Sequence, residues 1–117
     1  MTIACASALS SPPRRLVEAG AAFYGIPDLT VFPTSSITDC PLLLNFGEKD
    51  DIKGFSDLSA LKNLTDSLDR DSKSYEKIIY PGVPHAFMNE QRPEVYSPEQ
   101  SAIAFEKTVA FFRKHLA

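Results

Sequence analysis

Residues 40–47 read "CPLLLNFG", a continuous apolar run that is bounded by a proline and a glycine. Apolar and polar residues do not alternate in this run, and its length suits a strand better than a helix. A strand of this kind is typical of a parallel sheet that helices cover on both faces. The stretch therefore predicts an α/β fold, and the segments around it supply the other elements.

Two further segments have strand character. "AGAAFYG" predicts a short buried strand over residues 20–25 that glycine closes, and "YEKIIYPG" predicts another over residues 75–82, with an apolar part at Ile78, Ile79 and Tyr80. Proline and turn residues between positions 26 and 39 predict a loop. From position 56 to 69 the apolar period becomes helical, with these leucines on one face: Leu58, Leu61, Leu64 and Leu68.

Helices are expected at both ends of the chain. Residues 2–9 are small or apolar and end at "SSPP", which indicates a short helix. Near the C-terminus, Ser97 is a suitable cap, Pro98 suits the first helical position, and Gln100 predicts a capping box. The helix that follows has an apolar stripe formed by Ala102, Phe105, Val109, Phe112 and Leu116.

After residue 19 the predicted order is strand, strand, helix, strand, helix. Alternation of this kind implies a mostly parallel sheet of about three strands flanked by helices. Three strands make a narrow sheet for such a fold. Residues 1–117 are therefore expected to be a single partial domain, the C-terminal portion of a larger fold whose N-terminal strands are missing.

Composition excludes several classes of protein. The chain has 117 residues, 44% of them apolar and 23% charged, and its net charge of −3 argues against binding to nucleic acid or to an anionic membrane. No apolar stretch is long enough to span a bilayer, and no signal peptide pattern is present, so a cytoplasmic location is expected. Cys5 and Cys40 lack metal-ligand spacing. Free thiols are expected at both, although a disulfide between them stays open, and no cofactor is predicted.

Polar residues follow two of the predicted strands. Glu48, Asp50 and Asp51 come after the first, and His85 comes after the next. Ligands of open parallel sheets bind at the carboxyl ends of the strands, so an acid and a histidine can meet there. The order of acid before histidine is that of an α/β-hydrolase triad, in which the acid orients the imidazole and the imidazole moves the proton of a nucleophile. The alternative is a set of solvated loop residues.

A nucleophile is not evident in the sequence. A hydrolase elbow needs glycines around its serine or cysteine because the turn is strained, and neither G-x-S-x-G nor G-x-C-x-G occurs. Cys5 stands in "IACAS" and Cys40 in "TDCPL". Both cysteines are therefore interpreted as packed thiols.

Three segments resemble the C-terminal half of the dienelactone hydrolase, or carboxymethylenebutenolidase, family of α/β-hydrolases. They are "CPLLLNFGEKDDIKGFSDLSALKNL", "YEKIIYPGVPHAFMNEQRPEVY" and "SAIAFEKTVAFFRKHL". The most specific pieces are the G-x-x-D of residues 47–50, the "YPG-x-x-HAF" of residues 80–87 and the "RPEVY" of residues 92–96.

The resemblance implies that Asp50 is the triad acid and His85 the triad base, with Asp51 and Glu48 as second choices for the acid. Family members have a cysteine or serine nucleophile in an elbow just before a helix similar to residues 1–9. The resemblance therefore implies that Met1 begins after this elbow, so that the nucleophile is missing. Two positions depart from the family pattern: Pro84 replaces a common glycine, and Asn89 stands where some members have a basic residue, for which Arg92 is a candidate substitute.

Three functions follow as hypotheses. The first is a cofactor-free hydrolase of small carboxylic esters or lactones, to which this chain contributes acid and histidine. The second is an inactive truncated fragment that acts as a binding or complementation piece, and the third is a truncated product with no independent function. In each case the first strand of the sheet is expected to lack a neighbour, and an unpaired apolar edge favours self-association.

Overall fold

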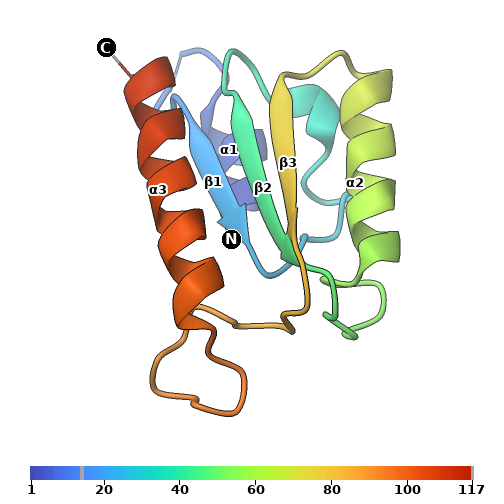
Figure 1. Cartoon of the computed structure of the whole chain (residues 1–117). Coiled ribbons are helices and arrows are strands. Elements are labelled where there is room, and N and C mark those ends of the chain that lie inside the picture. Colours follow the sequence, from blue (N-terminus) through green and yellow to red (C-terminus); the bar gives the residue numbers. More distant parts are fainter. Residues whose placement is uncertain (14, 117) are drawn as a thin grey trace.

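The computed structural model describes residues 1–13 and 15–116. Its elements follow the predicted order (Figure 1). They are α1 (Thr2–Leu9), β1 (Gly20–Phe23), the 3₁₀ helix η1 (Thr34–Ser36), β2 (Leu42–Gly47), α2 (Leu58–Arg70), β3 (Tyr75–Tyr80) and α3 (Pro98–His115). The strands form one parallel sheet in the order β1-β2-β3. This confirms the predicted sheet of three parallel strands between helices.

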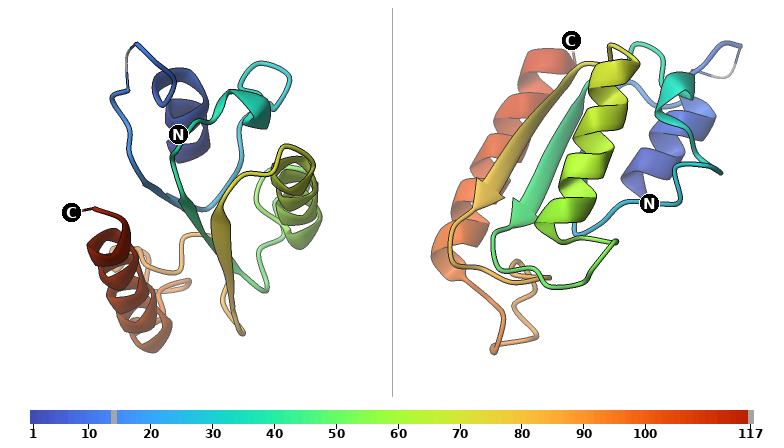
Figure 2. Two further views of the ribbon diagram at one scale, coloured as in Figure 1. Left: turned by 90° about the horizontal axis from the view of Figure 1, so that it is seen from above. Right: turned by 90° about the vertical axis from the view of Figure 1, so that its right-hand side faces the viewer.

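Strand β2 is the centre of the fold. All of its residues are buried, as the apolar run predicted, because α1 and α2 cover one face of the sheet and α3 lies on the other (Figure 2). On the first face, Leu42, Leu44 and Phe46 pack with Ile3 and Leu64 in the main apolar core. A strand enclosed on both faces buries nearly every side chain, which is why its sequence shows no alternation.

Helix α2 begins at Leu58 rather than at Ser56, because Asp57 caps it by accepting a hydrogen bond from the amide of Ala60 at 3.0 Å. Three of the four predicted leucines are buried against the sheet: Leu61, Leu64 and Leu68. Leu58, in the first turn, is exposed.

Helix α3 differs from its prediction in two respects. The apolar stripe is not the face that the sheet buries: Ser101, Ala104 and Phe111 are buried, whereas Phe105 is 63% exposed. At the cap, the Ser97 hydroxyl accepts from the Gln100 amide at 3.3 Å as predicted, but the amide of Ser97 donates to the Phe87 carbonyl at 2.9 Å. That amide therefore anchors the preceding loop instead of completing a capping box.

Two remaining predictions concern the cysteines and the membrane. Cys5 is half-buried and Cys40 is buried, and both are free thiols rather than a disulfide. Among the described helices, none combines the length and the apolar character that crossing a membrane would require.

Candidate active site

Loops from two strands meet at the carboxyl edge of the sheet, and Gly47 is the residue that lets them do so. A Cβ atom at position 47 would lie 2.5 Å from the Val83 carbonyl oxygen, so only glycine fits there. Backbone hydrogen bonds then join the two loops, from Glu48 to the Tyr80 carbonyl and from Lys49 to the Val83 carbonyl, each at 2.9 Å. The loop that follows β2 is thereby fixed beside the loop that follows β3.

This junction brings Asp50 and His85 into direct contact. The Nδ1 atom of His85 lies 2.8 Å from Oδ2 of Asp50, a hydrogen-bonding distance. The side chain of Asp50 is 1% exposed and that of His85 is 26% exposed. The carboxylate is therefore enclosed by protein while the imidazole keeps access to solvent, and Nε2 has no hydrogen-bond partner among the described residues.

The other two acids do not reach the imidazole. Oε1 of Glu48 accepts a hydrogen bond from the amide of Gly82 at 3.0 Å, which holds that side chain on the outer surface of the loop. Asp51 is exposed to solvent. Of the three acids that the sequence offers after β2, only Asp50 lies within hydrogen-bonding distance of His85.

Ser56 is part of this site although the sequence analysis did not identify it. Its hydroxyl donates to Oδ1 of Asp50 at 2.8 Å and lies 3.1 Å from Nδ1 of His85. The side chain is completely buried, so Ser56 has no exposed hydroxyl with which to attack a substrate. No motif marks this serine, because its contact with Asp50 arises only when residues 50–57 fold back on themselves.

Aromatic rings support the loop that carries His85. Phe87 is fully buried, and its ring centroid lies 5.1 Å from that of Tyr80. Tyr24, at the end of β1, lies 5.3 Å from His85 between ring centroids, and its hydroxyl accepts from the amide of Met88 at 3.0 Å. Burial raises the pKa of Tyr24, which keeps its hydroxyl protonated. All three strands therefore contribute to positioning the imidazole.

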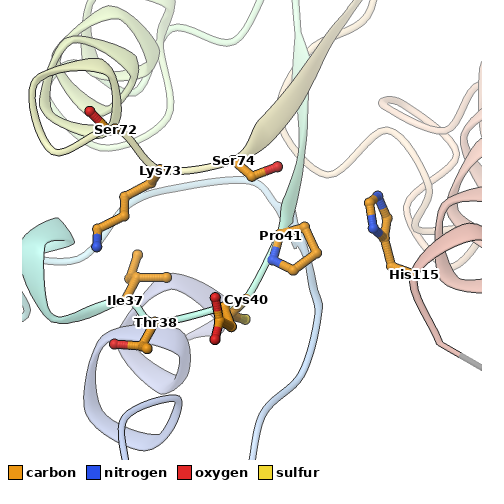
Figure 3. A pocket seen from close by; sticks show the side chains of 9 residues that line it. Ile37, Thr38, Cys40, Pro41, Ser72, Lys73, Ser74 and His115 are labelled. Carbon is orange, nitrogen blue, oxygen red and sulfur yellow. The ribbon is translucent and has the colours of Figure 1, made fainter.

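The second histidine, His115, is at the other end of the sheet. It lines a cavity of about 480 Å³ together with Cys40 and Pro41, which precede β2, and Lys73 (Figure 3). Asp50 follows the carboxyl end of the same strand, so Cys40 and His115 are separated from the Asp50–His85 pair by the length of β2. Burial also raises the pKa of the Cys40 thiol, which makes it a poor nucleophile. In the part of the chain that the structure describes, no cluster of His, Cys, Asp and Glu could hold a metal ion.

A parallel sheet with an acid after one strand and a paired histidine after the next defines the class as an α/β-hydrolase fold. The family model of the dienelactone hydrolase family matches residues 2–116. The chain belongs to this family, which is a family of hydrolases.

Individual relatives agree with this assignment. The chain is 32% identical over 101 residues to "Protein usf" of Aquifex pyrophilus and 31% identical over 101 residues to an Aquifex aeolicus protein assigned as a carboxymethylenebutenolidase. Each match covers 86% of this chain and 42% of the relative, so the chain spans less than half the length of these curated relatives.

Comparison with solved structures supports the fold. A crystal structure of a protein assigned as a dienelactone hydrolase from Klebsiella pneumoniae superimposes with a TM-score of 0.66 at 21% identity, over 82% of this chain and 42% of that one. At this identity the likeness shows the α/β-hydrolase fold alone.

Proposed function

We propose that this chain provides the acid and the base of a hydrolase of small carboxylic esters or lactones. The observation that carries the proposal is the 2.8 Å contact between Nδ1 of His85 and Oδ2 of Asp50 at the carboxyl edge of the sheet. The substrate class rests on family membership and on the name carboxymethylenebutenolidase given to the Aquifex aeolicus relative. The cytoplasmic location expected from the sequence stays a prediction.

In the proposed reaction, Asp50 holds His85 with its Nδ1–H toward the carboxylate, so that the lone pair of Nε2 is free. Nε2 accepts the proton of the nucleophile as the nucleophile attacks the acyl carbon, and returns that proton to the leaving oxygen when the ester bond breaks. A water molecule then attacks the acyl carbon of the acyl-enzyme and gives a proton to Nε2. The bond between the acyl carbon and the nucleophile breaks, Nε2 returns the proton to the nucleophile, and the carboxylic acid is released. Every proton transfer therefore passes through one imidazole nitrogen.

The nucleophile is assigned to the part of the family fold outside residues 1–117. Neither Ser56 nor Cys40 is suited to that role, because Ser56 is buried and Cys40 lies at the opposite end of the sheet. The N-terminus of α1 does lie at the carboxyl edge, near the ends of the strands (Figure 2). The hydroxyl of Thr2 donates to the carbonyl of Ala21, the second residue of β1, at 3.2 Å, which joins this end of α1 to that strand. From the position of the N-terminus in Figure 2, we expect a segment joined before Met1 to enter at the edge where His85 lies.

Ester hydrolysis by the isolated and the extended chain tests this proposal. Residues 1–117 are expected to hydrolyse p-nitrophenyl acetate no faster than their His85→Ala variant. The same residues joined after the part of the Aquifex aeolicus relative that precedes its matching segment are expected to hydrolyse the ester with a dependence on His85. Turnover by the isolated chain that is lost in His85→Ala would mean that a nucleophile lies within residues 1–117.

A second candidate function, binding without catalysis, rests on one flank of the molecule. Strand β1 has β2 on one side and no strand on the other among the described residues. On α3, Lys114 pairs with Glu76 of β3 at 3.0 Å, so that flank of the helix faces β3. Because an α-helix has about 3.6 residues per turn, Phe105 and its apolar stripe lie on the flank of α3 opposite Lys114. Figure 1 shows α3 next to β1, so we place this stripe on the β1 side. An unpaired strand and an apolar helix face on one side would suit a second copy of the chain.

A further inference from the structure

We infer that Ser56 is a positioning residue for the Asp50–His85 pair, in that its hydroxyl selects the tautomer of the imidazole that leaves Nε2 free. The inference rests on the proposed function, because it describes how the proposed base is prepared. It starts from the position of the Ser56 hydroxyl, 2.8 Å from Oδ1 of Asp50 and 3.1 Å from Nδ1 of His85.

The single proton of this hydroxyl determines the direction of the hydrogen bonds. A carboxylate only accepts, so the proton of Ser56 points to Oδ1 of Asp50 and the lone pairs of its oxygen face Nδ1 of His85. Oδ2 of Asp50 also faces Nδ1, at 2.8 Å. An unprotonated Nδ1 would meet two acceptors and no donor. The two oxygens together therefore favour the Nδ1–H tautomer, which places the free lone pair on Nε2.

The hydroxyl also fixes the carboxylate that orients the histidine. Oδ1 of Asp50 accepts from the Ser56 hydroxyl and from the amide of Ile52 at 3.1 Å, while Oδ2 faces His85. Both oxygens thus have partners, and a rotation of the carboxylate would break hydrogen bonds to each of them. Loss of the hydroxyl would leave the Ile52 amide as the remaining partner of Oδ1.

A purely structural role for Ser56 does not account for these contacts. The turn at residues 52–57 is held by backbone hydrogen bonds, in which the amides of Phe55, Ser56 and Asp57 all donate to the Ile52 carbonyl. Helix α2 is capped by Asp57. Neither feature uses the Ser56 hydroxyl, whose hydrogen bonds are directed to Asp50 and His85 alone.

The test is a long-range nitrogen–proton correlation spectrum of residues 1–117, recorded for neutral imidazole, which reports the tautomer of each histidine. His115 is the only other histidine and serves as an internal reference. In the parent chain, His85 is expected to be mainly Nδ1–H. In Ser56→Ala the ratio of Nδ1–H to Nε2–H is expected to fall about fivefold, as loss of one hydrogen bond implies. Ser59→Ala is the matched control, because that exposed hydroxyl bonds only Asp57 and should leave the ratio unchanged.

Two further variants, Ser56→Cys and Asp50→Asn, make the tautomer measurement decisive. If Ser56→Ala does not fold, Ser56→Cys retains the shape with a weaker donor, and an intermediate ratio is expected. Asp50→Asn tests the proposed pair itself and should change the ratio more than either serine variant. If the ratio of Nδ1–H to Nε2–H in His85 is unchanged in Ser56→Ala, the proposed role of Ser56 is wrong. The same holds for Ser56→Cys if that variant has to replace Ser56→Ala. If Asp50→Asn alters the tautomer ratio while the serine variant does not, the role of Ser56 is wrong but the proposed pairing of Asp50 with His85 still stands.

Discussion

At the residue scale, the proposed site depends as much on a missing side chain as on Asp50 and His85. Gly47 allows the loops after β2 and β3 to approach so closely that the Val83 carbonyl occupies the space of a Cβ atom. The backbone hydrogen bonds that fix both loops follow from this approach. The sequence contains this glycine in its G-x-x-D motif, but only the structure shows which atoms require it.

Replacement of Gly47 by alanine is expected to lower the free energy of unfolding by about 2 kcal/mol, because the neighbouring carbonyl belongs to the backbone and cannot move freely. The His85 ring resonances are expected to shift as well. Urea denaturation and the imidazole spectrum measure these effects. Gly54→Ala is the control: Gly54 has a φ of +73° but no atom within 4 Å of a Cβ, so that variant should lose stability and leave the His85 signals in place.

Tyr80 gives a prediction for alkaline pH. Burial raises the pKa of Tyr80 to about 12, from the ordinary value of 10.0 that applies to the unfolded chain. Between these values the unfolded state releases the phenolic proton while the folded state keeps it, so stability falls as the pH rises. The slope is at most about 1.4 kcal/mol per pH unit.

Tyr80→Phe isolates the contribution of Tyr80 to the loss of stability at alkaline pH, because the other tyrosines titrate equally in the parent chain and in the variant. At neutral pH the variant should be about 1 kcal/mol less stable, since Tyr80 donates to the buried Oδ1 of Asn45 at 2.8 Å. Above pH 10 the difference should shrink. Urea denaturation at several pH values measures the difference, and parallel pH profiles for the two proteins would show that Tyr80 ionises normally in the folded state.

At the element scale, the sequence predicted the strands and helices well but not the orientation of α3. The run at residues 40–47 is apolar throughout because β2 is enclosed on both faces, so its pattern reports its position directly. Helix α3 instead has apolar residues on two faces, and a periodicity argument selected the one with Phe105 and Val109. The sheet covers the other face, with Ala104 and Phe111.

Alanine substitutions on the two faces of α3 distinguish them. Phe111 is 3% exposed, and Phe111→Ala is expected to cost about 3 kcal/mol through lost burial and the cavity it leaves. Phe105→Ala makes the same chemical change at a position that is 63% exposed, and should change stability by less than about 0.5 kcal/mol. Thermal and urea unfolding provide the comparison. Equal losses would mean that the helix is rotated from the orientation described.

The candidate site was only partly predictable from the sequence, because topology determines which strand ends meet but not how the loops fold over them. The edge of a parallel sheet is fixed by topology, so an acid and a histidine that follow neighbouring strands were expected to meet. The choice of Asp50 over Asp51 came from a family resemblance, and its catalytic role stays a proposal. In the structure, Asp50 is the acid that contacts His85, because the turn directs it inward. Ser56 and Tyr24 were missed, since their contacts with His85 depend on how two loops fold over the sheet.

At the scale of the whole molecule, two surfaces on one flank lack partners among the described residues. One is the outer edge of β1 and the other is the apolar stripe of α3. The relatives are more than twice as long as this chain, which covers 42% of them. We propose that isolated residues 1–117 self-associate through this flank.

Sedimentation velocity over a range of concentrations tests self-association. The average mass of residues 1–117 is expected to exceed that of a monomer and to rise with concentration. Phe105→Glu, which places a charge in the apolar stripe, should shift the population toward monomer, whereas Lys107→Glu on the opposite flank of α3 should not. A monomer at every concentration would contradict the proposal.

The central claim is that Asp50 and His85 act together as the acid and base of an ester hydrolase. Its most direct test is the kcat of p-nitrophenyl acetate hydrolysis by residues 1–117 joined after the part of the Aquifex aeolicus relative that precedes its matching segment, compared between Asp50→Asn and Asp51→Asn. We expect Asp50→Asn to lower kcat by about 10³- to 10⁴-fold, because an amide at that position supports the wrong imidazole tautomer. For Asp51→Asn, which changes the exposed neighbouring residue, we expect little change in kcat. Equal activity in the two variants would contradict the assignment of Asp50.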